Sequence, residues 1–130
     1  MKILLDTQTW LWLQVSPDRL NAEALTLVED TEQELLLSAA SSWEIAIKVA
    51  LGKLTLPTAP AAYVPDRMRS SGVEALPVTH THALAVAALP RHHRDPFDRL
   101  LIAQAQLENL TVLTSDRIFS AYDVPVRWSD

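Results

Sequence analysis

Short apolar runs alternate along the chain with longer segments in which apolar residues recur at helical spacing. The strongest runs are residues 2–5, 35–37 and 110–114, and weaker ones lie at 73–78 and 124–128. Continuous apolar runs are typical of strands that are buried on both faces, as in parallel sheets. The pattern therefore predicts an α/β fold with a mostly parallel central sheet of about four to five strands.

Helices are expected in the segments between these strands. Ser16-Pro17-Asp18 is typical of a helix start, since Ser is a common N-cap and Pro fits the first turn. The further helices that the spacing predicts cover residues 41–51, 58–71, 79–89, 96–107 and 116–122. Helices that link parallel strands cover both faces of the sheet, so we expect three layers with ligands at the carboxyl ends of the strands.

Composition narrows the class of protein. The chain has 130 residues, 48% of them hydrophobic and 21% charged, which predicts a single globular domain over residues 1–130. The absence of cysteine excludes disulfides, zinc–thiolate sites, iron–sulfur clusters and cysteine nucleophiles. No apolar run is long enough for a membrane span, and the carboxylate of Asp6 comes too early for a signal peptide. We therefore expect a cytoplasmic protein that does not bind a membrane.

The charge balance limits how the chain could bind nucleic acid. Eleven Lys and Arg residues stand against sixteen Asp and Glu residues, which gives a net charge of −5. A protein that binds nucleic acid through overall positive charge would have the opposite sign. With only two glycines, the chain also lacks a glycine-rich phosphate-binding loop. A nucleic-acid substrate would therefore require a local basic patch, or metal ions that join carboxylates to phosphates.

Acidic residues are expected to gather at one edge of the sheet. Asp6 follows the first strand, and Asp116 follows the strand at 110–114. Glu44 and Asp98 lie in the first turns of two predicted helices that begin at the same edge. Carboxylates held close together repel one another and take up protons unless a cation lies between them. Mg²⁺ and Mn²⁺ prefer such oxygen ligands, and either ion activates water for phosphodiester hydrolysis.

Helix capping is the alternative interpretation for most of these acids. Ser41 and Glu44 match the spacing of a capping box, in which a Glu bonds back to the N-cap amide. Asp95 and Asp98 have the same spacing, and Asp116 could cap the short helix that follows it. Asp6 has no such local explanation, because a carboxylate that ends a buried strand is costly to desolvate without a partner.

Four motifs surround these acids, in the order Leu4-Leu5-Asp6-Thr7, Ser41-Ser42-Trp43-Glu44-Ile45-Ala46, Arg94-Asp95-Pro96-Phe97-Asp98-Arg99-Leu100-Leu101-Ile102-Ala103 and Leu113-Thr114-Ser115-Asp116. Together they resemble the PIN domain family and, within it, the VapC-like ribonuclease toxins of toxin–antitoxin pairs. The resemblance covers nearly the whole chain. It implies a PIN-like α/β/α fold and an Mg²⁺- or Mn²⁺-dependent endoribonuclease that inhibits translation or growth when released.

The resemblance also implies a site and partners. The catalytic metal ligands it points to are Asp6, Glu44, Asp98 and Asp116. It further implies a homodimer, an RNA substrate and inhibition by a small cognate antitoxin.

Several nearby residues are candidates for supporting roles. Arg91 and Arg94 lie just before Asp95 and form either a basic rim that contacts RNA phosphates or a solvated loop. Thr7 and Ser115 each adjoin an acid, where a hydroxyl could orient a carboxylate or a water, or serve as an ordinary turn residue. Asp95 is expected to support the site as the N-cap of the helix that carries Asp98.

Other functions remain open at this point. A haloacid-dehalogenase-like phosphatase also ends its first strand with Asp, but it places a second Asp two residues on, where this chain has Gln8. The chain could also be an RNA-processing nuclease without an antitoxin. A third alternative is a catalytically inactive PIN-like module that only binds a protein partner. Metal-dependent RNA cleavage by the purified chain separates the enzymes from the inactive module.

Overall fold

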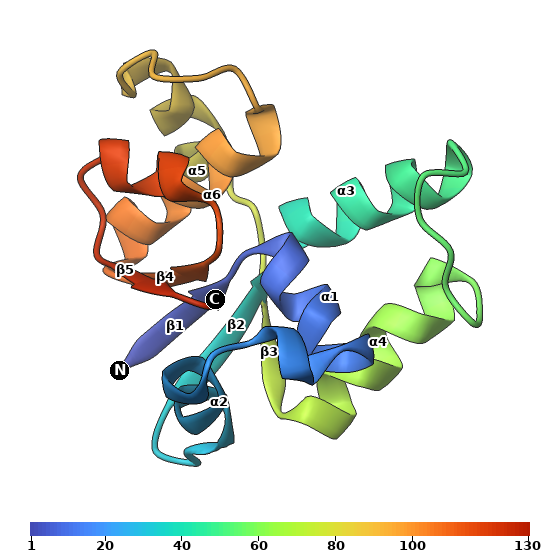
Figure 1. Cartoon of the computed structure of the whole chain (residues 1–130). Coiled ribbons are helices and arrows are strands. Elements are labelled where there is room, and N and C mark those ends of the chain that lie inside the picture. Colours follow the sequence, from blue (N-terminus) through green and yellow to red (C-terminus); the bar gives the residue numbers. More distant parts are fainter.

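A single parallel sheet organises the molecule. The computed structural model describes residues 1–130, and every strand pairing in it is parallel. The strands are β1 (Lys2–Leu5), β2 (Glu34–Ser38), β3 (Val73–Leu76), β4 (Thr111–Thr114) and β5 (Val126–Trp128). They lie in the order β3-β2-β1-β4-β5, which puts the first strand of the chain at the centre (Figure 1). The predicted α/β class and parallel sheet are confirmed.

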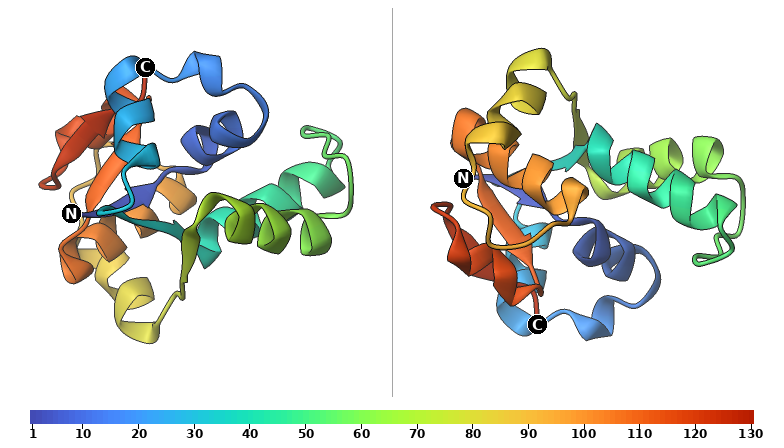
Figure 2. Two further views of the ribbon diagram at one scale, coloured as in Figure 1. Left: turned by 90° about the horizontal axis from the view of Figure 1, so that it is seen from below. Right: turned by 90° about the horizontal axis from the view of Figure 1, so that it is seen from above.

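Short helices connect these strands. The α-helices are α1 (Thr7–Val15), α2 (Ala22–Glu29), α3 (Ala39–Ala50), α4 (Pro60–Ser71), α5 (His80–Ala85) and α6 (Pro96–Glu108). Three 3₁₀ helices complete the set, and they are η1 (Pro17–Arg19), η2 (Val86–Ala88) and η3 (Arg117–Ala121). None of these helices is long and apolar enough to cross a membrane. The paired helices α3 and α4 extend away from the sheet, as both views in Figure 2 show.

Hydrophobic clusters cover both faces of the sheet, which confirms the predicted three layers. Side chains alternate between the faces along a strand, so the central strand contributes to both clusters. Ile3 and Leu5 pack on one face against residues of α1, α2 and α4. Leu4 packs on the other face with Ile102 of α6 and Phe119 of η3. All three β1 side chains are completely buried, which explains the unbroken apolar run at the start of the sequence.

Three helices begin at least two residues earlier or later than the sequence predicts, and α4, which starts at Pro60 rather than at residue 58, is the simplest case. Ser16-Pro17-Asp18 starts only the 3₁₀ turn η1, and α2 begins later, after Asn21 caps it by accepting a hydrogen bond from the Ala24 amide at 2.7 Å. Helix α3 begins at Ala39 rather than Ser41, because the hydroxyl of Ser38 accepts a hydrogen bond from the Ala40 amide at 3.0 Å. A serine at the very end of a strand thus takes the capping role.

Candidate active site

Asp6 connects the central strand to the first helix. One of its carboxylate oxygens accepts a hydrogen bond from the Thr9 amide at 2.7 Å, so Asp6 is the N-cap of α1. The other oxygen accepts a hydrogen bond from the hydroxyl of Thr114, at the end of β4. The residue is only 5% exposed. The expectation that Asp6 has no capping role is therefore wrong, since its buried charge is stabilised partly by the cap.

Glu44 lies in the second turn of α3, because that helix begins two residues earlier than expected. Its predicted first-turn position and capping box are wrong, since Ser38 and not Ser41 is the N-cap. The Glu44 carboxylate instead lies 3.1 Å from Nζ of Lys48, one helical turn further on. Only 12% of the Glu44 side chain is exposed. Local capping therefore does not account for this acid.

Asp95 and Asp98, which the sequence predicts as one capping box, have separate roles. Asp95 is the N-cap of α6, and one of its oxygens accepts hydrogen bonds from the amides of Phe97 at 2.9 Å and Asp98 at 3.0 Å. The Asp98 carboxylate does not return to the N-cap amide to complete a capping box. It lies 3.3 Å from Nε2 of His93 instead. The capping prediction holds for Asp95 and is wrong for Asp98.

Asp116 is the most exposed of the four acids. It caps η3 by accepting a hydrogen bond from the Ile118 amide at 3.1 Å, as the sequence predicts. Its own amide donates to the hydroxyl oxygen of Thr114 at 3.0 Å. Since that hydroxyl also donates to Asp6, Thr114 fixes the spacing between two acids that are far apart in sequence.

One cavity of about 260 Å³ joins these residues at the carboxyl edge of the sheet. Its lining, which is almost entirely polar, consists of Asp6, Thr7, Gln8, Leu11, Glu44, Lys48, Asp95, Asp98, Ser115 and Asp116. The expectation that the four acids meet at this edge is confirmed. The parallel sheet brings them together, because the C-terminal ends of its strands and the N-terminal ends of the helices that follow lie at the same edge.

The predicted supporting hydroxyls line the same cavity but do not bond to its acids. Thr7 donates its hydroxyl hydrogen to Oγ of Ser41 at 2.9 Å, which joins the start of α1 to α3. Ser115 faces the cavity and forms no side-chain hydrogen bond within the chain. The hydroxyl that does orient a carboxylate belongs to Thr114, a residue of the fourth motif for which no supporting role was predicted.

Crowding of the acids favours protonation. Burial first, and then the negative charges of the surrounding acids, together raise the pKa of Asp98 to about 8; these acids are Asp95, Asp116, Asp6 and Glu44. Burial also raises the pKa of Asp6, although the hydrogen bonds from Thr114 and Thr9 act in the opposite direction. A helix N-terminus favours the ionised form of a carboxyl, but at Asp98 burial and the neighbouring charges outweigh that effect. Without a cation, the Asp98 carboxyl holds a proton at neutral pH.

Comparison with known proteins decides the family. The sequence pattern that defines the PIN domain matches residues 3–125. The chain belongs to the PIN domain family. The resemblance drawn from the four sequence motifs is confirmed at this level, and the two helix-covered faces of the parallel sheet are those of a PIN domain.

Individual relatives are similar over different extents. Ribonuclease VapC16 of Mycobacterium tuberculosis is 49% identical over 69 residues, which are 53% of this chain and 48% of that protein. The match thus spans about half the length of the curated relative. Among solved structures, DNA-bound VapBC from Salmonella typhimurium has a TM-score of 0.69 at 19% identity, with 98% of each chain covered. FitAcB from Neisseria gonorrhoeae has a TM-score of 0.60 at 25% identity, with 95% of each chain covered.

The donor set of this PIN domain fits a hard divalent cation. The cavity offers carboxylate and hydroxyl oxygens and no sulfur. No group of three or more His, Cys, Asp or Glu side chains is arranged to hold a metal ion by itself. Mg²⁺ is compatible with this arrangement, because it keeps several waters and needs only one or two carboxylates from the protein.

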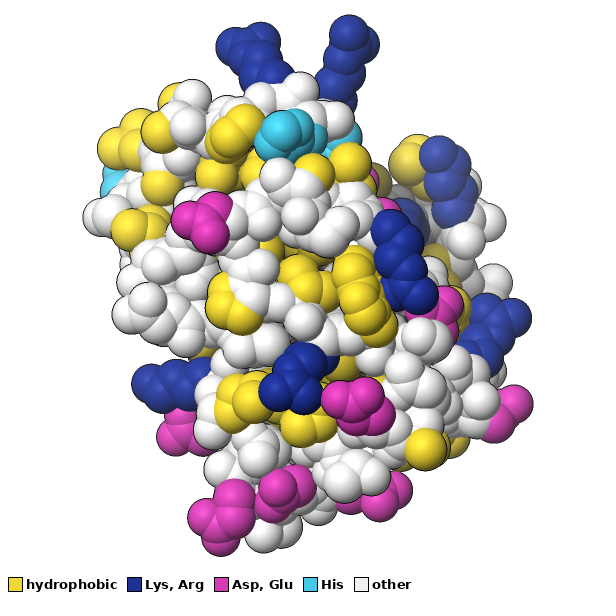
Figure 3. Space-filling model, turned by 60° about the vertical axis from the view of Figure 1, so that its left-hand side comes forward, with side chains coloured by type: hydrophobic (Ala, Val, Ile, Leu, Met, Phe, Trp, Pro, Cys, Tyr) yellow, Lys and Arg dark blue, Asp and Glu magenta, His cyan; other side chains and the backbone are white.

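A basic cavity adjoins the acidic one. It has a volume of about 610 Å³ and is lined by Val86, Ala87, Arg91, His92, His93, Arg94 and Arg99. Arg91 and Arg94 are exposed, and neither forms an ion pair within the chain. On the face in Figure 3, two basic side chains extend from one end while acidic side chains gather at the other. This PIN domain is therefore basic beside its acidic cavity despite its net negative charge.

Three residues of the site carry no strong signal in the sequence. Lys48 could have been found from its spacing, because Glu and Lys four residues apart on a helix are neighbours. Thr114 could not, since it reaches Asp6 only through the pairing of β1 with β4. His93 is five residues from Asp98, but it lies in a loop whose path no periodicity predicts.

Proposed function

We propose that the chain is a metal-dependent endoribonuclease and the toxin of a toxin–antitoxin pair. The observation that carries the proposal is the meeting of four carboxylates in one cavity beside unpaired arginines. The first feature suits a divalent cation, and the second suits the phosphates of a nucleic acid. The name of the relative VapC16, a ribonuclease, supports this reaction, and the VapBC structures support the toxin role.

The ligands proposed for Mg²⁺ or Mn²⁺ are Asp6, Glu44, Asp98 and Asp116, with one or two of these carboxylates binding the ion directly and the others through its waters. When bound, such an ion activates water and neutralises the oxygens of the phosphoryl group under attack. Thr9 and Thr114 hold the Asp6 carboxylate in place before any substrate arrives. Asp95 fixes the first turn of α6 by accepting two hydrogen bonds from backbone amides, and it thereby sets the position of the Asp98 backbone.

An antitoxin is the partner that the VapBC structures support. A small antitoxin would inhibit the chain until it is released. We also propose a homodimer, on the resemblance of the sequence motifs alone. We propose that the activity is cytoplasmic, because the proposed RNA substrate is found there. A chain without cysteine is compatible with that reducing compartment. An RNA-processing nuclease without an antitoxin would share the chemistry and differ only in lacking the inhibitor. A small open reading frame next to the gene for this chain distinguishes the two.

Metal removal tests the reaction directly. Purified protein treated with EDTA is expected to lose RNA cleavage down to background, because the crowded carboxylates then have no cation to bind. Added Mg²⁺ or Mn²⁺ should restore cleavage, and Zn²⁺ should not be required. The measurement is the fragmentation of total cellular RNA on a denaturing gel over time. Full cleavage in EDTA would contradict the proposed chemistry, and no cleavage with either ion would favour the inactive protein-binding module.

Arg91 and Arg94 are expected to bind substrate rather than to act on it. Replacing both with Ala should raise KM and weaken its salt dependence, because each lost phosphate contact lowers the log–log slope by about 0.7 for single-stranded RNA. The value of kcat should change much less, since binding common to the ground and transition states affects KM. Initial rates at two salt concentrations give both quantities.

A matched control keeps the change in net charge constant. Arg69 and Arg127 are also exposed, and they lie outside both cavities. Replacing this pair with Ala removes the same charge and should leave KM and the salt slope near the wild-type values. Equal effects of the two double variants would assign Arg91 and Arg94 to a solvated loop.

A further inference from the structure

A series of hydrogen bonds leads from α6, by way of the residue that follows η3, back to the acidic cavity. Nη1 of Arg99 donates to the hydroxyl of Tyr122 at 3.1 Å. The same hydroxyl lies 2.7 Å from Nδ1 of His93. Nε2 of His93, on the far side of the ring, lies 3.3 Å from a carboxylate oxygen of Asp98. None of the three residues behind Asp98 has a role in the function proposed above.

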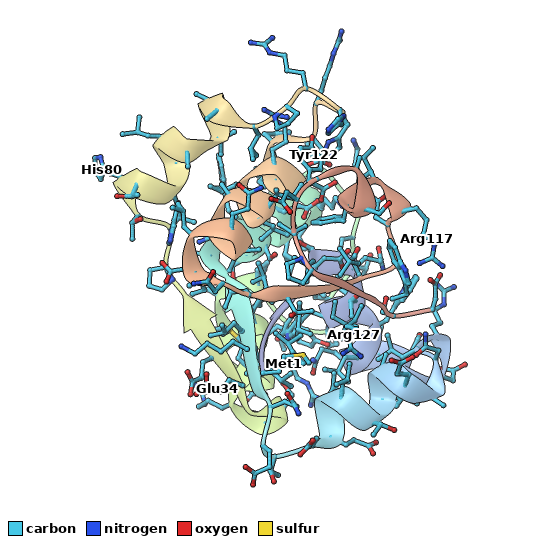
Figure 4. The ribbon with its side chains drawn as sticks, turned by 90° about the vertical axis from the view of Figure 1, so that its left-hand side faces the viewer. Met1, Glu34, His80, Arg117, Tyr122 and Arg127 are labelled. Carbon is cyan, nitrogen blue, oxygen red and sulfur yellow. The ribbon has the colours of Figure 1, made fainter.

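Arg99, at the start of this series of hydrogen bonds, is itself held by the backbone around it. The guanidinium of Arg99 also donates to the backbone carbonyls of Pro90 at 2.7 Å, Val86 at 3.2 Å and Leu89 at 3.4 Å. Tyr122 is only 5% exposed, and Figure 4 shows it between η3 and the segment that leads into α6. The His93 ring packs edge-on against the Tyr122 ring at 5.5 Å between centroids. His93 therefore cannot turn without breaking contacts to buried groups.

The polarity of the hydrogen bonds sets which atom His93 presents to Asp98. Arginine only donates, so the Tyr122 oxygen is an acceptor toward Arg99. The hydroxyl hydrogen of Tyr122 is then directed to Nδ1 of His93. A neutral imidazole that accepts at one nitrogen carries its hydrogen on the other. Nε2 of His93 thus donates to the Asp98 carboxylate.

The orientation of the Asp98 carboxylate depends on this one contact, whereas that of the Asp6 carboxylate is shared between two. The His93 contact is the only side-chain hydrogen bond that the Asp98 carboxylate makes. The Asp6 carboxylate, by comparison, is held by both Thr9 and Thr114. Without His93, the backbone of α6 would place Asp98 but nothing would fix the rotation of its carboxylate.

We infer that His93, held by Tyr122 and Arg99, is the positioning residue that orients the Asp98 carboxylate toward a divalent cation. The inference rests on the proposed function, in which Asp98 is a ligand of that cation. Groups that hydrogen-bond to metal ligands set ligand orientation, and their removal commonly lowers metal affinity or activity by about 10- to 100-fold. The same loop carries Arg91 and Arg94, so the substrate-binding cavity and the acidic cavity share one support.

Two variants remove the contact in different ways. Tyr122→Phe deletes one hydroxyl and keeps the buried ring, while His93→Leu removes both ring nitrogens. Calorimetric titration of the RNA-free protein with MnCl₂ should show affinity about 10-fold weaker for each. Their combination should not weaken affinity tenfold again, because both variants interrupt the same path. His93→Gln can still donate to Asp98 and should keep more of the wild-type affinity than His93→Leu.

Controls separate positioning from general damage. Tyr63→Phe removes the hydroxyl of another largely buried tyrosine, one that forms no hydrogen bond within the chain, and His80→Leu removes an exposed histidine on α5. Both should bind Mn²⁺ like the wild type. RNA cleavage by the network variants should show a lower kcat at saturating Mn²⁺ with little change in KM for RNA. If His93→Leu fails to fold, Tyr122→Phe alone decides the outcome.

The possible results are distinct. Wild-type affinity in Tyr122→Phe and His93→Gln would overturn the positioning role while the proposed function stands. Failure of the wild-type protein to bind Mn²⁺ and to cleave RNA would overturn the proposed function itself. An equal loss in the Tyr63→Phe control would assign the effect to packing and would also overturn the positioning role.

Discussion

Asp6→Asn is expected to reduce RNA cleavage by more than about 100-fold, beyond the range typical of groups that only orient a metal ligand. The substitution removes a negative charge from the centre of the acidic cavity and keeps the volume of the side chain. Folding should survive, because Asn is as good an N-cap as Asp and can still accept a hydrogen bond from the Thr9 amide. Loss of a buried charge also removes a desolvation cost.

Cleavage rates and unfolding curves together check this expectation. Asp18→Asn makes the same chemical change at an exposed position of η1 and should cleave RNA at the wild-type rate. Near-wild-type cleavage by Asp6→Asn would remove Asp6 from the catalytic set. Unfolding of the variant at ordinary temperature would instead show that the fold needs the second carboxylate oxygen of Asp6, which accepts the hydrogen bond from Thr114.

Asp98→Asn is expected to stabilise the metal-free protein at neutral pH while it abolishes cleavage. The pKa of Asp98 is about 8 in the folded state and about 3.9 in an unfolded chain. Between these values the folded protein holds a proton that the unfolded chain has released. The stability of the wild type therefore falls as pH rises through this window, by at most about 1.4 kcal/mol per pH unit for one proton, and levels off above pH 8.

Denaturant unfolding in EDTA at several pH values between 5 and 9 measures this linkage. The free energy of unfolding of Asp98→Asn should fall much less with pH than that of the wild type. The variant should be more stable than the wild type, and the difference should be largest near pH 8. Added Mg²⁺ should raise the unfolding midpoint of the wild type and leave that of the variant nearly unchanged. Parallel curves for the two proteins across the whole range would contradict the raised pKa of Asp98.

The fold could be predicted from the sequence where a local pattern determines the structure. The unbroken apolar runs of β1 and β4 predicted buried parallel strands, and their ends located Asp6 and Asp116. Helix starts were less certain, because several serines and a proline offered competing caps. Ser38 became the cap of α3 only because β2 ends there, which moved Glu44 from the first helical turn to the second.

The supporting residues of the site could not be predicted for a different reason. Thr114 and Asp6 are 108 residues apart in sequence, and their contact exists only because β1 and β4 are neighbours. His93 and Tyr122 meet across 29 residues, through a loop whose path no periodicity encodes. A sequence read in short windows locates acids at strand ends, but it does not show which hydroxyl or imidazole faces them.

The central place of β1 determines when the cavity can exist. Of the five strands, the one in the middle of the sheet is made first, yet one edge of that strand stays open until β4 is made. At about 5–20 residues per second, Thr114 is added roughly 5–20 s after Asp6. During that interval a chain still attached to the ribosome lacks the complete set of acids. The cavity that we propose for RNA cleavage therefore cannot form before β4 has been made and has paired with β1.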